Sequence, residues 1–106
     1  ILTDNKTFLT VSNDNSLRTW YPNSSYSTVT FHSFATNLGN LIYVRSQNLI
    51  ALTTINGVIK FFRFDNFQFV KDIYADNTSI RFLSVLKNDY LVSVSDNGTM
   101  KIWNIN

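Results

Sequence analysis

The chain has 106 residues, a length that allows one domain with a modest core. Its hydrophobic fraction of 44% and charged fraction of 15% exclude an intrinsically disordered chain, because so much apolar surface has to be buried. The net charge of +2 comes from basic residues spread evenly along the sequence, so composition gives little support to nucleic-acid binding.

Residue usage favours β-strands over helices. The sequence contains no Glu and few Ala or Met, whereas β-branched and aromatic residues are abundant. No apolar stretch approaches the roughly 18 residues that cross a bilayer, and the start of the chain does not resemble a signal segment, so we expect no membrane partner. The absence of Cys excludes a disulfide framework and favours an intracellular address, cytoplasmic or nuclear.

A repeat with a period of about forty residues organises the chain. Residues 8–20 align without a gap on residues 50–62 and again on residues 91–103. Each copy closes on an aromatic residue, and these residues, Trp20, Phe62 and Trp103, are 42 and then 41 positions apart. A period of roughly 40 to 45 residues is typical of one four-stranded propeller blade. Four more residue classes agree in all copies: a Ser or Thr, a turn Asp or Asn, an apolar residue and a basic residue (Ser12, Thr54, Ser95; Asp14, Asn56, Asn97; Leu17, Ile59, Met100; Arg18, Lys60, Lys101).

Each copy predicts a β-hairpin, because two runs of strand-forming residues flank a short polar turn that contains Asn, and in two copies Gly. The intervals between copies supply two further strands each, at 26–31 and 38–44, and at 67–73 and 80–86. In the second strand of each interval the apolar residues fall at offsets of zero, three and five. This departure from alternation predicts a β-bulge at Gly39-Asn40 and another at Arg81-Phe82.

These residues resemble the WD-repeat family of β-propellers, and the resemblance spans nearly the whole chain. Residues 91–104 are similar to the second and third strands of the family's repeat, with its Ser, turn residue and closing Trp in place. The family's Trp-Asp dipeptide is missing from all copies, and Ser33-Phe34 and Ala75-Asp76 replace its Gly-His pair. The resemblance implies an all-β fold of four-stranded antiparallel blades, in which the family's buried Trp, Ser, His and Asp hydrogen-bond network is incomplete.

The repeats divide one incomplete propeller domain into the hairpin of a partial blade at 1–23 and two blade repeats at 24–65 and 66–106. A propeller closes with four to eight blades. Fewer blades leave open edges and bare apolar faces. We therefore expect the chain to belong to a longer protein or an assembly, with the remaining blades in the same propeller or in a partner chain.

The resemblance also implies where a protein partner binds. Family members contact partners through the loop before the first strand, the bulge, and the position before the turn Asp or Asn. The matching positions are His32, Phe34 and Asp76 for the loops, Asn40 and Arg81 for the bulges, and Asn13, Ile55 and Asp96 for the turns. Phe34 and Ile55 stand out, because an apolar side chain on a polar rim is typical of an interaction hot spot. The alternative for both is packing against the next blade.

Catalytic and metal sites are not expected. His32 is the only histidine, and the Asp residues are scattered, so neither a catalytic triad nor a set of metal ligands has suitable spacing. We predict a non-catalytic interaction scaffold or recognition platform without a cofactor, for example an adaptor subunit of a larger complex such as a ubiquitin ligase. Two alternatives stay open: a propeller enzyme with its active site outside this piece, and a weak nucleic-acid surface formed by Arg18, Lys60 and Lys101.

Overall fold

The computed structural model describes residues 8–12, 14–21, 28–33 and 37–105, and for residues 8, 21 and 28–33 it describes the backbone alone. This part of the chain contains strands and two 3-10 turns and no α-helix, which confirms the all-β prediction. The strands are β1 (Phe8–Val11), β2 (Ser16–Tyr21), β3 (Thr28–Ser33), β4 (Leu38–Val44), β5 (Leu49–Thr54), β6 (Val58–Arg63), β7 (Phe69–Tyr74), β8 (Ile80–Val85), β9 (Tyr90–Ser95) and β10 (Met100–Asn104); the 3-10 turns are η1 (Arg45–Gln47) and η2 (Lys87–Asp89).

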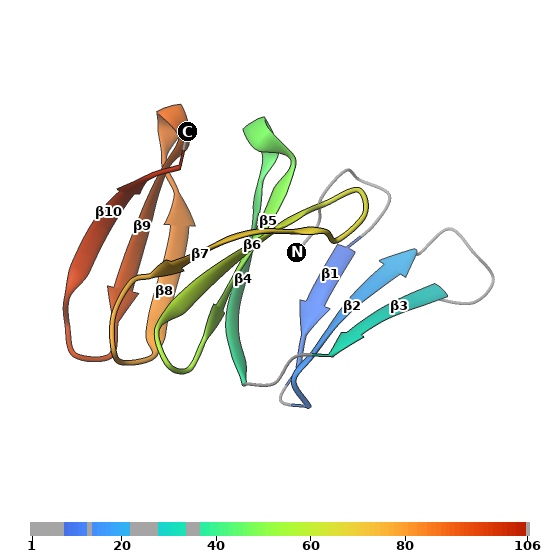
Figure 1. Ribbon diagram of the computed structural model, residues 1–106, viewed down its shortest axis with the longest axis horizontal. Helices are drawn as coiled ribbons and strands as arrows, with labels where there is room; N and C mark the ends of the chain where they lie inside the picture. Colours follow the sequence, from blue (N-terminus) through green and yellow to red (C-terminus); the bar gives the residue numbers. More distant parts are fainter. Residues whose placement is uncertain (1–7, 13, 22–27, 34–36, 106) are drawn as a thin grey trace.

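Three antiparallel sheets stand side by side like blades (Figure 1). The first sheet is β1-β2-β3, the second is β4-β5-β6-β7, and the third is β8-β9-β10. Strand β4 lies against β8 of the third sheet and against β1 of the first, so neighbouring sheets meet along these strands. The first and second sheets each combine strands from two successive repeats, because β3 and β7 each pair with the strand before them. The division at residues 23 and 65 therefore remains a prediction about the sequence repeat.

Both β-bulges expected from the sequence are present. Leu38 pairs with Thr54 and Leu41 with Leu52, so Gly39 and Asn40 together oppose one residue of β5. In the third sheet Ile80 pairs with Ser95 and Phe82 with Val94, which leaves Arg81 outside the register. The bulge explains the spacing of the apolar residues, since one extra residue returns the following side chains to the buried face.

The outer strands differ from the prediction. Strand β7 begins at Phe69, two residues later than expected, because Phe67 has a positive φ of 56° and closes a turn by donating its N–H to the Arg63 carbonyl. Strand β3 spans Thr28–Ser33 and ends two residues later than expected, and positions 26 and 27 of the expected range lie outside the described residues. A third bulge, where Val70 is extra between Phe69 and Lys71, was not expected, because β7 is exposed along much of its length and shows no burial pattern to break.

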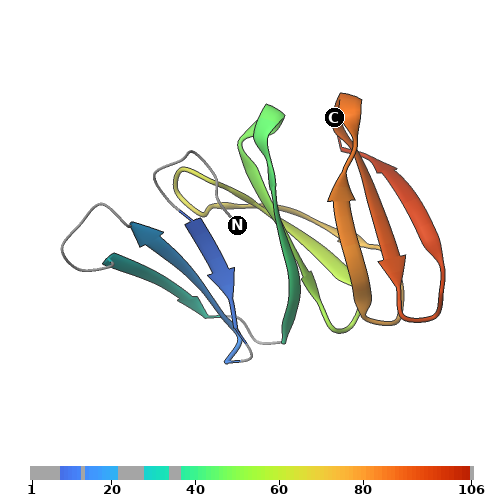
Figure 2. The same cartoon turned by 180° about the vertical axis from the view of Figure 1, so that it is seen from behind.

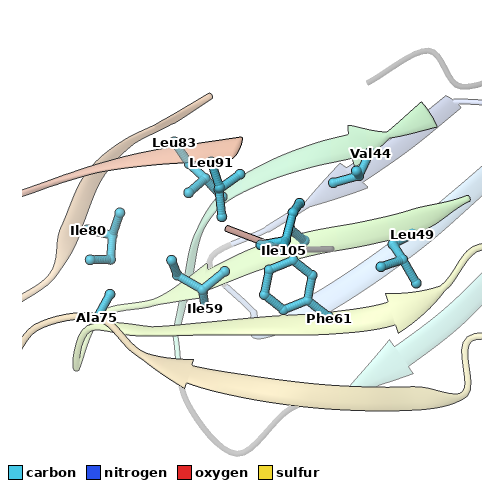
Figure 3. Close-up of a cluster of buried hydrophobic side chains, with 10 residues drawn as sticks. Val44, Leu49, Ile59, Phe61, Ala75, Ile80, Leu83, Leu91 and Ile105 are labelled. Atoms are coloured by element: carbon cyan, nitrogen blue, oxygen red, sulfur yellow. The ribbon is translucent and has the colours of Figure 1, made fainter. Parts of the chain in front are cut away.

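Apolar clusters hold the three sheets together. The cluster between the second and third sheets is drawn in Figure 3, where Ile59 and Phe61 of β6 lie with Leu83 and Leu91 of the third sheet. Leu9 and Leu17 of the first sheet pack against Leu38, Ile50 and Leu52 of the second. Strand β5 is consequently buried along its whole length. A sheet covered on both faces needs apolar residues at odd and even positions alike, which is what this strand supplies.

We expect Phe61→Ala to lower the free energy of unfolding by about 3–5 kcal/mol, because Phe61 is fully buried between two sheets and its loss leaves a cavity. Urea unfolding followed by circular dichroism measures this change. Tyr74→Ala is the control, since its side chain is 77% exposed, and it is expected to change stability by less than about 0.5 kcal/mol. Equal effects of the two substitutions would contradict the assigned core.

Candidate interaction rim

One end of the molecule gathers the loops that the sequence singled out. The turns that follow β5 and β9, the connection that leads into β8 and the start of β4 lie at this end, at the bottom of Figures 1 and 2. We call the β5–β6 turn (55–57), the β7–β8 connection (75–79), the β9–β10 turn (96–99) and the two bulges the rim. Of the candidate partner-binding residues, Asn40, Ile55, Asp76, Arg81 and Asp96 lie on it.

Three further candidates have no described side chain. Phe34 and Asn13 lie outside the described residues, and His32 is described only as backbone of β3, where it pairs with Leu17. Their proposed contacts with a partner remain predictions from the sequence.

The recurring Ser or Thr and the Asp or Asn two positions later build the hairpin turns. In the β5–β6 turn the Thr54 hydroxyl bonds the Asn56 amide oxygen and accepts the Val58 N–H at 3.2 Å. In the β9–β10 turn Asn97 Oδ1 accepts the Thr99 N–H at 3.0 Å. An Asx side chain that accepts a backbone N–H stabilises a tight turn. These repeated residues are therefore structural, and they fix the backbone on which the rim side chains stand.

The β5–β6 turn is pressed against the β7–β8 connection. Gly57 has a φ of 86°, and its carbonyl accepts the N–H groups of Ala75 and Asp76 at 3.0 and 3.2 Å. A Cβ added at Gly57 would lie 2.0 Å from the Asp76 carbonyl oxygen and 2.6 Å from that of Thr78. Only glycine satisfies both the positive φ and this close approach.

Asp76 carries a role that sequence reasoning missed. Its side chain is only 8% exposed, and it accepts hydrogen bonds from the Ser95 hydroxyl at 2.9 Å and from Asn97 Nδ2 at 3.1 Å. The ammonium of Lys101 lies 3.8 Å from the carboxylate. The Ser95 hydrogen bond above all, helped by the Asn77 N–H and the charge of Lys101, lowers the pKa of Asp76 against the opposing effect of burial. Asp76 joins the β7–β8 connection to the β9–β10 turn, and the departure from the family's Gly-His pair is the signal that marks this position.

The other described candidates divide into bound and exposed side chains. The backbone N–H of Asn40 donates to Thr53 Oγ1 at 2.8 Å, and its Nδ2 donates to the Ile80 carbonyl at 3.0 Å, so Asn40 links the bulge of β4 to β8. Ile55 is 49% exposed at its turn. Arg81 Nε and Asp96 Oδ1 form a 3.2 Å ion pair that is open to solvent. Among its candidate residues the rim thus presents one exposed apolar side chain, Ile55, and one exposed ion pair on a fixed backbone.

A tryptophan donates a side-chain hydrogen bond within each of the two end sheets. Trp103 Nε1 donates to Ser93 Oγ, and Trp20 Nε1 donates to Thr10 Oγ1, both at 2.9 Å. At the equivalent places in the second sheet stand Phe62 and Leu52, so donor and acceptor are lost together. No buried polar group is left unpaired at this pair of positions, which is the condition for such a replacement to be tolerated.

The three basic residues of the repeat are each paired with a carboxylate. Arg18 lies 2.9 Å from Asp14, Lys60 lies 3.2 Å from Asp72, and Lys101 reaches Asp76. Nucleic-acid binding needs cations that can neutralise phosphates. Because these charges are already balanced within the chain, the geometry lends no support to a basic ring.

The described residues contain no cluster of three or more His or Asp side chains that could hold a metal ion. Within the same residues, no helix is long and apolar enough to cross a membrane.

Comparison with known proteins identifies the fold. No family model and no curated protein matches the sequence. Two solved structures, of RRP9 WD40 repeats and of U3-55K, superpose on 99% of this chain with TM-scores of 0.85 and 0.84 at 15% identity. The fold is that of part of a WD-repeat-like β-propeller. This WD-repeat-like chain spans only 34% and 35% of those two structures.

Two computationally designed proteins share the WD-repeat-like arrangement. The Ika4 design matches 95% of the chain with a TM-score of 0.77 at 21% identity, and the chain spans 61% of it. The Ika8 design matches 94% with a TM-score of 0.76 at 21% identity, and the chain spans 30% of it. At such identities the likeness establishes the fold alone.

Substituting the two turn glycines tests the close approach at Gly57. We expect Gly57→Ala to destabilise the protein by at least about 2 kcal/mol, because a positive φ and a clash with backbone carbonyls act together. Gly98→Ala is the matched control, since Gly98 has the same φ of 86° and no atom within 4 Å of an added Cβ. Only the backbone strain of about 1 kcal/mol applies there. Thermal unfolding of both variants measures the difference, and equal losses would argue against the contact.

The stability of the protein in acid tests the hydrogen bonds that the Asp76 carboxylate accepts. A pKa held below its ordinary value of 3.8 means that the unfolded chain binds the proton more readily, so the contribution of Asp76 is present above that value and is lost as pH falls through the lower folded pKa. Asp76→Asn and Ser95→Ala should each flatten the dependence of melting temperature on pH between about 5 and 2. If the melting temperature of both variants depended on pH as steeply as that of the parent, the stabilising role of Asp76 would be contradicted. Some slope remains in either variant, because hydrogen bonding by Ser16 also lowers the pKa of Asp14.

Proposed function

We propose that the chain is a non-catalytic part of a WD-repeat propeller whose rim binds another protein. The proposal rests on the exposure of Ile55. This aliphatic side chain is half-exposed at the tip of a turn that Thr54, Asn56 and Gly57 hold rigid. Interaction hot spots combine an apolar anchor with a polar surround. The exposed Arg81–Asp96 ion pair supplies polar contacts on the same rim.

Rigidity of the rim supports this assignment. A loop that is ordered before binding loses little conformational freedom when a partner arrives, so more of the contact energy becomes affinity. The β5–β6 turn donates the Ile55 N–H to the Asn37 carbonyl at 3.1 Å and accepts two N–H groups at Gly57. The Asp96 N–H is likewise bound, to the Ser79 carbonyl at 2.9 Å. The backbone on which Ile55 and Asp96 stand is therefore fixed from both sides.

The finer proposal is an adaptor subunit of a larger intracellular complex, with a ubiquitin ligase as one example. This part rests on the sequence resemblance to WD-repeat proteins and on the absence of Cys from the chain. The partner itself is a protein surface that can cover an aliphatic side chain and meet one charge of each sign.

Site-specific photocrosslinking tests the rim in the full-length protein within its own cells. A photoreactive phenylalanine analogue replaces Ile55 in one variant and Tyr74, which is 77% exposed on the outer strand β7, in the control. We expect discrete protein adducts from position 55 that are missing at position 74. Identical adduct patterns from both positions, or none from position 55, would reject the rim as the binding surface.

Ile55→Asp then measures the energetic weight of the contact. Removing a hot-spot side chain and placing a charge in its pocket should weaken binding of the crosslinked partner at least about tenfold, by isothermal titration calorimetry. Tyr74→Asp is the matched control and should leave the dissociation constant unchanged. Circular dichroism of both variants verifies that the fold is retained.

A further inference from the structure

Two neighbouring turns present different side chains at equivalent positions of the rim. Ile55 in the β5–β6 turn and Asp96 in the β9–β10 turn each precede an Asn-Gly pair of the repeat. Ile55 is 49% exposed, and the side chain of Asp96 is 51% exposed. The rim therefore offers an apolar contact at the second sheet and a charged contact at the third.

The bulges beside these turns differ as well. Gly39 in β4 and Arg81 in β8 hold equivalent positions of the repeat. A Cβ added at Gly39 would lie 2.9 Å from Thr53 Oγ1, so this place has no room for a longer side chain. Arg81 lies outside the register of its strand pair, and its side chain is 72% exposed. Because a bulge redirects a side chain, the third sheet places a guanidinium on the rim beside Asp96.

Asp96 orients the Arg81 guanidinium through one nitrogen only. Arg81 Nε donates to Asp96 Oδ1 at 3.2 Å, and this is the one hydrogen bond of the Arg81 side chain among the described residues. The Asp96 N–H is itself bound to the Ser79 carbonyl at 2.9 Å, so the carboxylate stands on a fixed backbone. A guanidinium carries five N–H donors. The two terminal nitrogens of Arg81 are therefore available to a partner.

The chemistry of this contact favours an acidic group. Two terminal guanidinium nitrogens bind a carboxylate through two parallel hydrogen bonds. A cation that approached Asp96 would instead compete with Arg81, which already holds Oδ1. The net charge of +2 also attracts an acidic partner rather than a basic one. The charged contact on the rim thus selects a carboxylate.

Exposure at these turn positions is a property of the turn itself. The β7–β8 connection packs directly on Gly57, whose carbonyl accepts two of its N–H groups, yet Ile55 stays half-exposed. The side chain at this position therefore projects away from the neighbouring connection. Gly57 and Gly98 share a φ of 86°, so the two turns have the same backbone geometry at this point. We expect Asp96 to project from its turn as Ile55 does.

The distance between the two contacts is set by the stacking of the sheets. Stacked sheets pack about 10 Å apart, and an extended chain advances about 3.3 Å per residue. The step from one turn to the other therefore takes about three residues of an extended segment. The β7–β8 connection lies between the two turns and is bonded to both, through Gly57 and through the Asp76–Ser95 hydrogen bond (Figures 1 and 2). This separation is consequently fixed before a partner binds.

We propose that the rim recognises an extended protein segment in which an apolar residue covers Ile55 and an acidic residue about three positions away binds the Arg81 guanidinium. Asp96 is a positioning residue, because it holds Arg81 and leaves the terminal nitrogens available. The inference rests on the proposed function, since it names the partner chemistry of the same rim. A segment with the apolar residue alone would make only one of the two contacts and would bind more weakly.

Arg81→Gln in the full-length protein tests the charged contact. The probe is a synthetic peptide of the segment that crosslinks to position 55, identified by mass spectrometry. We expect its dissociation constant to rise at least about tenfold, because the peptide carboxylate loses its guanidinium. Arg63→Gln is the matched control, since Arg63 is exposed at the end of β6 away from the rim, and it should leave the constant unchanged.

Two further measurements separate recognition from a purely structural role of Arg81. Added salt should weaken peptide binding to the parent more than to Arg81→Gln, because only the parent makes the charged contact. Replacing the acidic residue of the peptide by Arg should abolish binding to the parent and restore binding to Arg81→Glu. Circular dichroism verifies that each variant is folded.

Arg81→Gln with parent affinity, or a crosslinked segment without Asp or Glu at the expected spacing, would overturn the proposal. If Ile55→Asp still weakened binding in that case, the proposed function would stand and only the partner chemistry would be rejected. Binding that is lost after phosphatase treatment of the partner would assign the anion to a phosphate and would also overturn the proposal. The absence of adducts from position 55 would reject the rim itself, and this inference with it.

Discussion

The second sheet buries apolar side chains on both of its faces, Ile50 and Leu52 toward the first sheet and Ala51, Ile59 and Phe61 toward the third. A single four-stranded sheet of this size cannot bury either face alone, so its stability comes from contacts with its neighbours. Everything else in the structure depends on this stacking. The sheets hold the loops at one end in fixed relative positions, and the order of the sheets determines which faces and edges remain open.

Polar contacts at the rim hold the loops of neighbouring sheets in fixed positions, so that the stacked sheets present a defined surface. The β7–β8 connection touches the turns of two sheets at once, through the backbone at Gly57 and through the Asp76 carboxylate at Ser95 and Asn97. Buried polar groups are stabilising only when their hydrogen bonds are satisfied, and Asp76 meets this condition with donors from its own connection and from the next turn. The same contacts that link the sheets also immobilise the loops that a partner would meet.

The sequence predicted most of the fold because the repeat supplies the same information more than once. The hairpins and both bulges of the inner strands follow from residues that agree between copies, such as Leu41 and Leu83. The start of β7 was missed because the turn at Phe67 depends on hydrogen bonds that no residue pattern records. The candidate rim was found as a set of positions. The sequence did not show which rim side chains are free to meet a partner, because the hydrogen bonds of Asp76 and Asn40 join residues 19 and 40 positions apart in the chain.

The distribution of the two tryptophans has a consequence for spectroscopy. Trp20 lies in the first sheet and Trp103 in the third, each with its indole N–H bound within its own sheet, and the second sheet has Phe62 at the matching place. Tryptophan fluorescence therefore observes the two flanking sheets, because the sheet between them contains no tryptophan. Backbone circular dichroism samples all three sheets. In a stack whose cohesion comes from nearest neighbours, the flanking sheets have fewer contacts and separate first. A fluorescence transition that precedes the dichroism transition would be the optical signature of a chain that unravels from its ends.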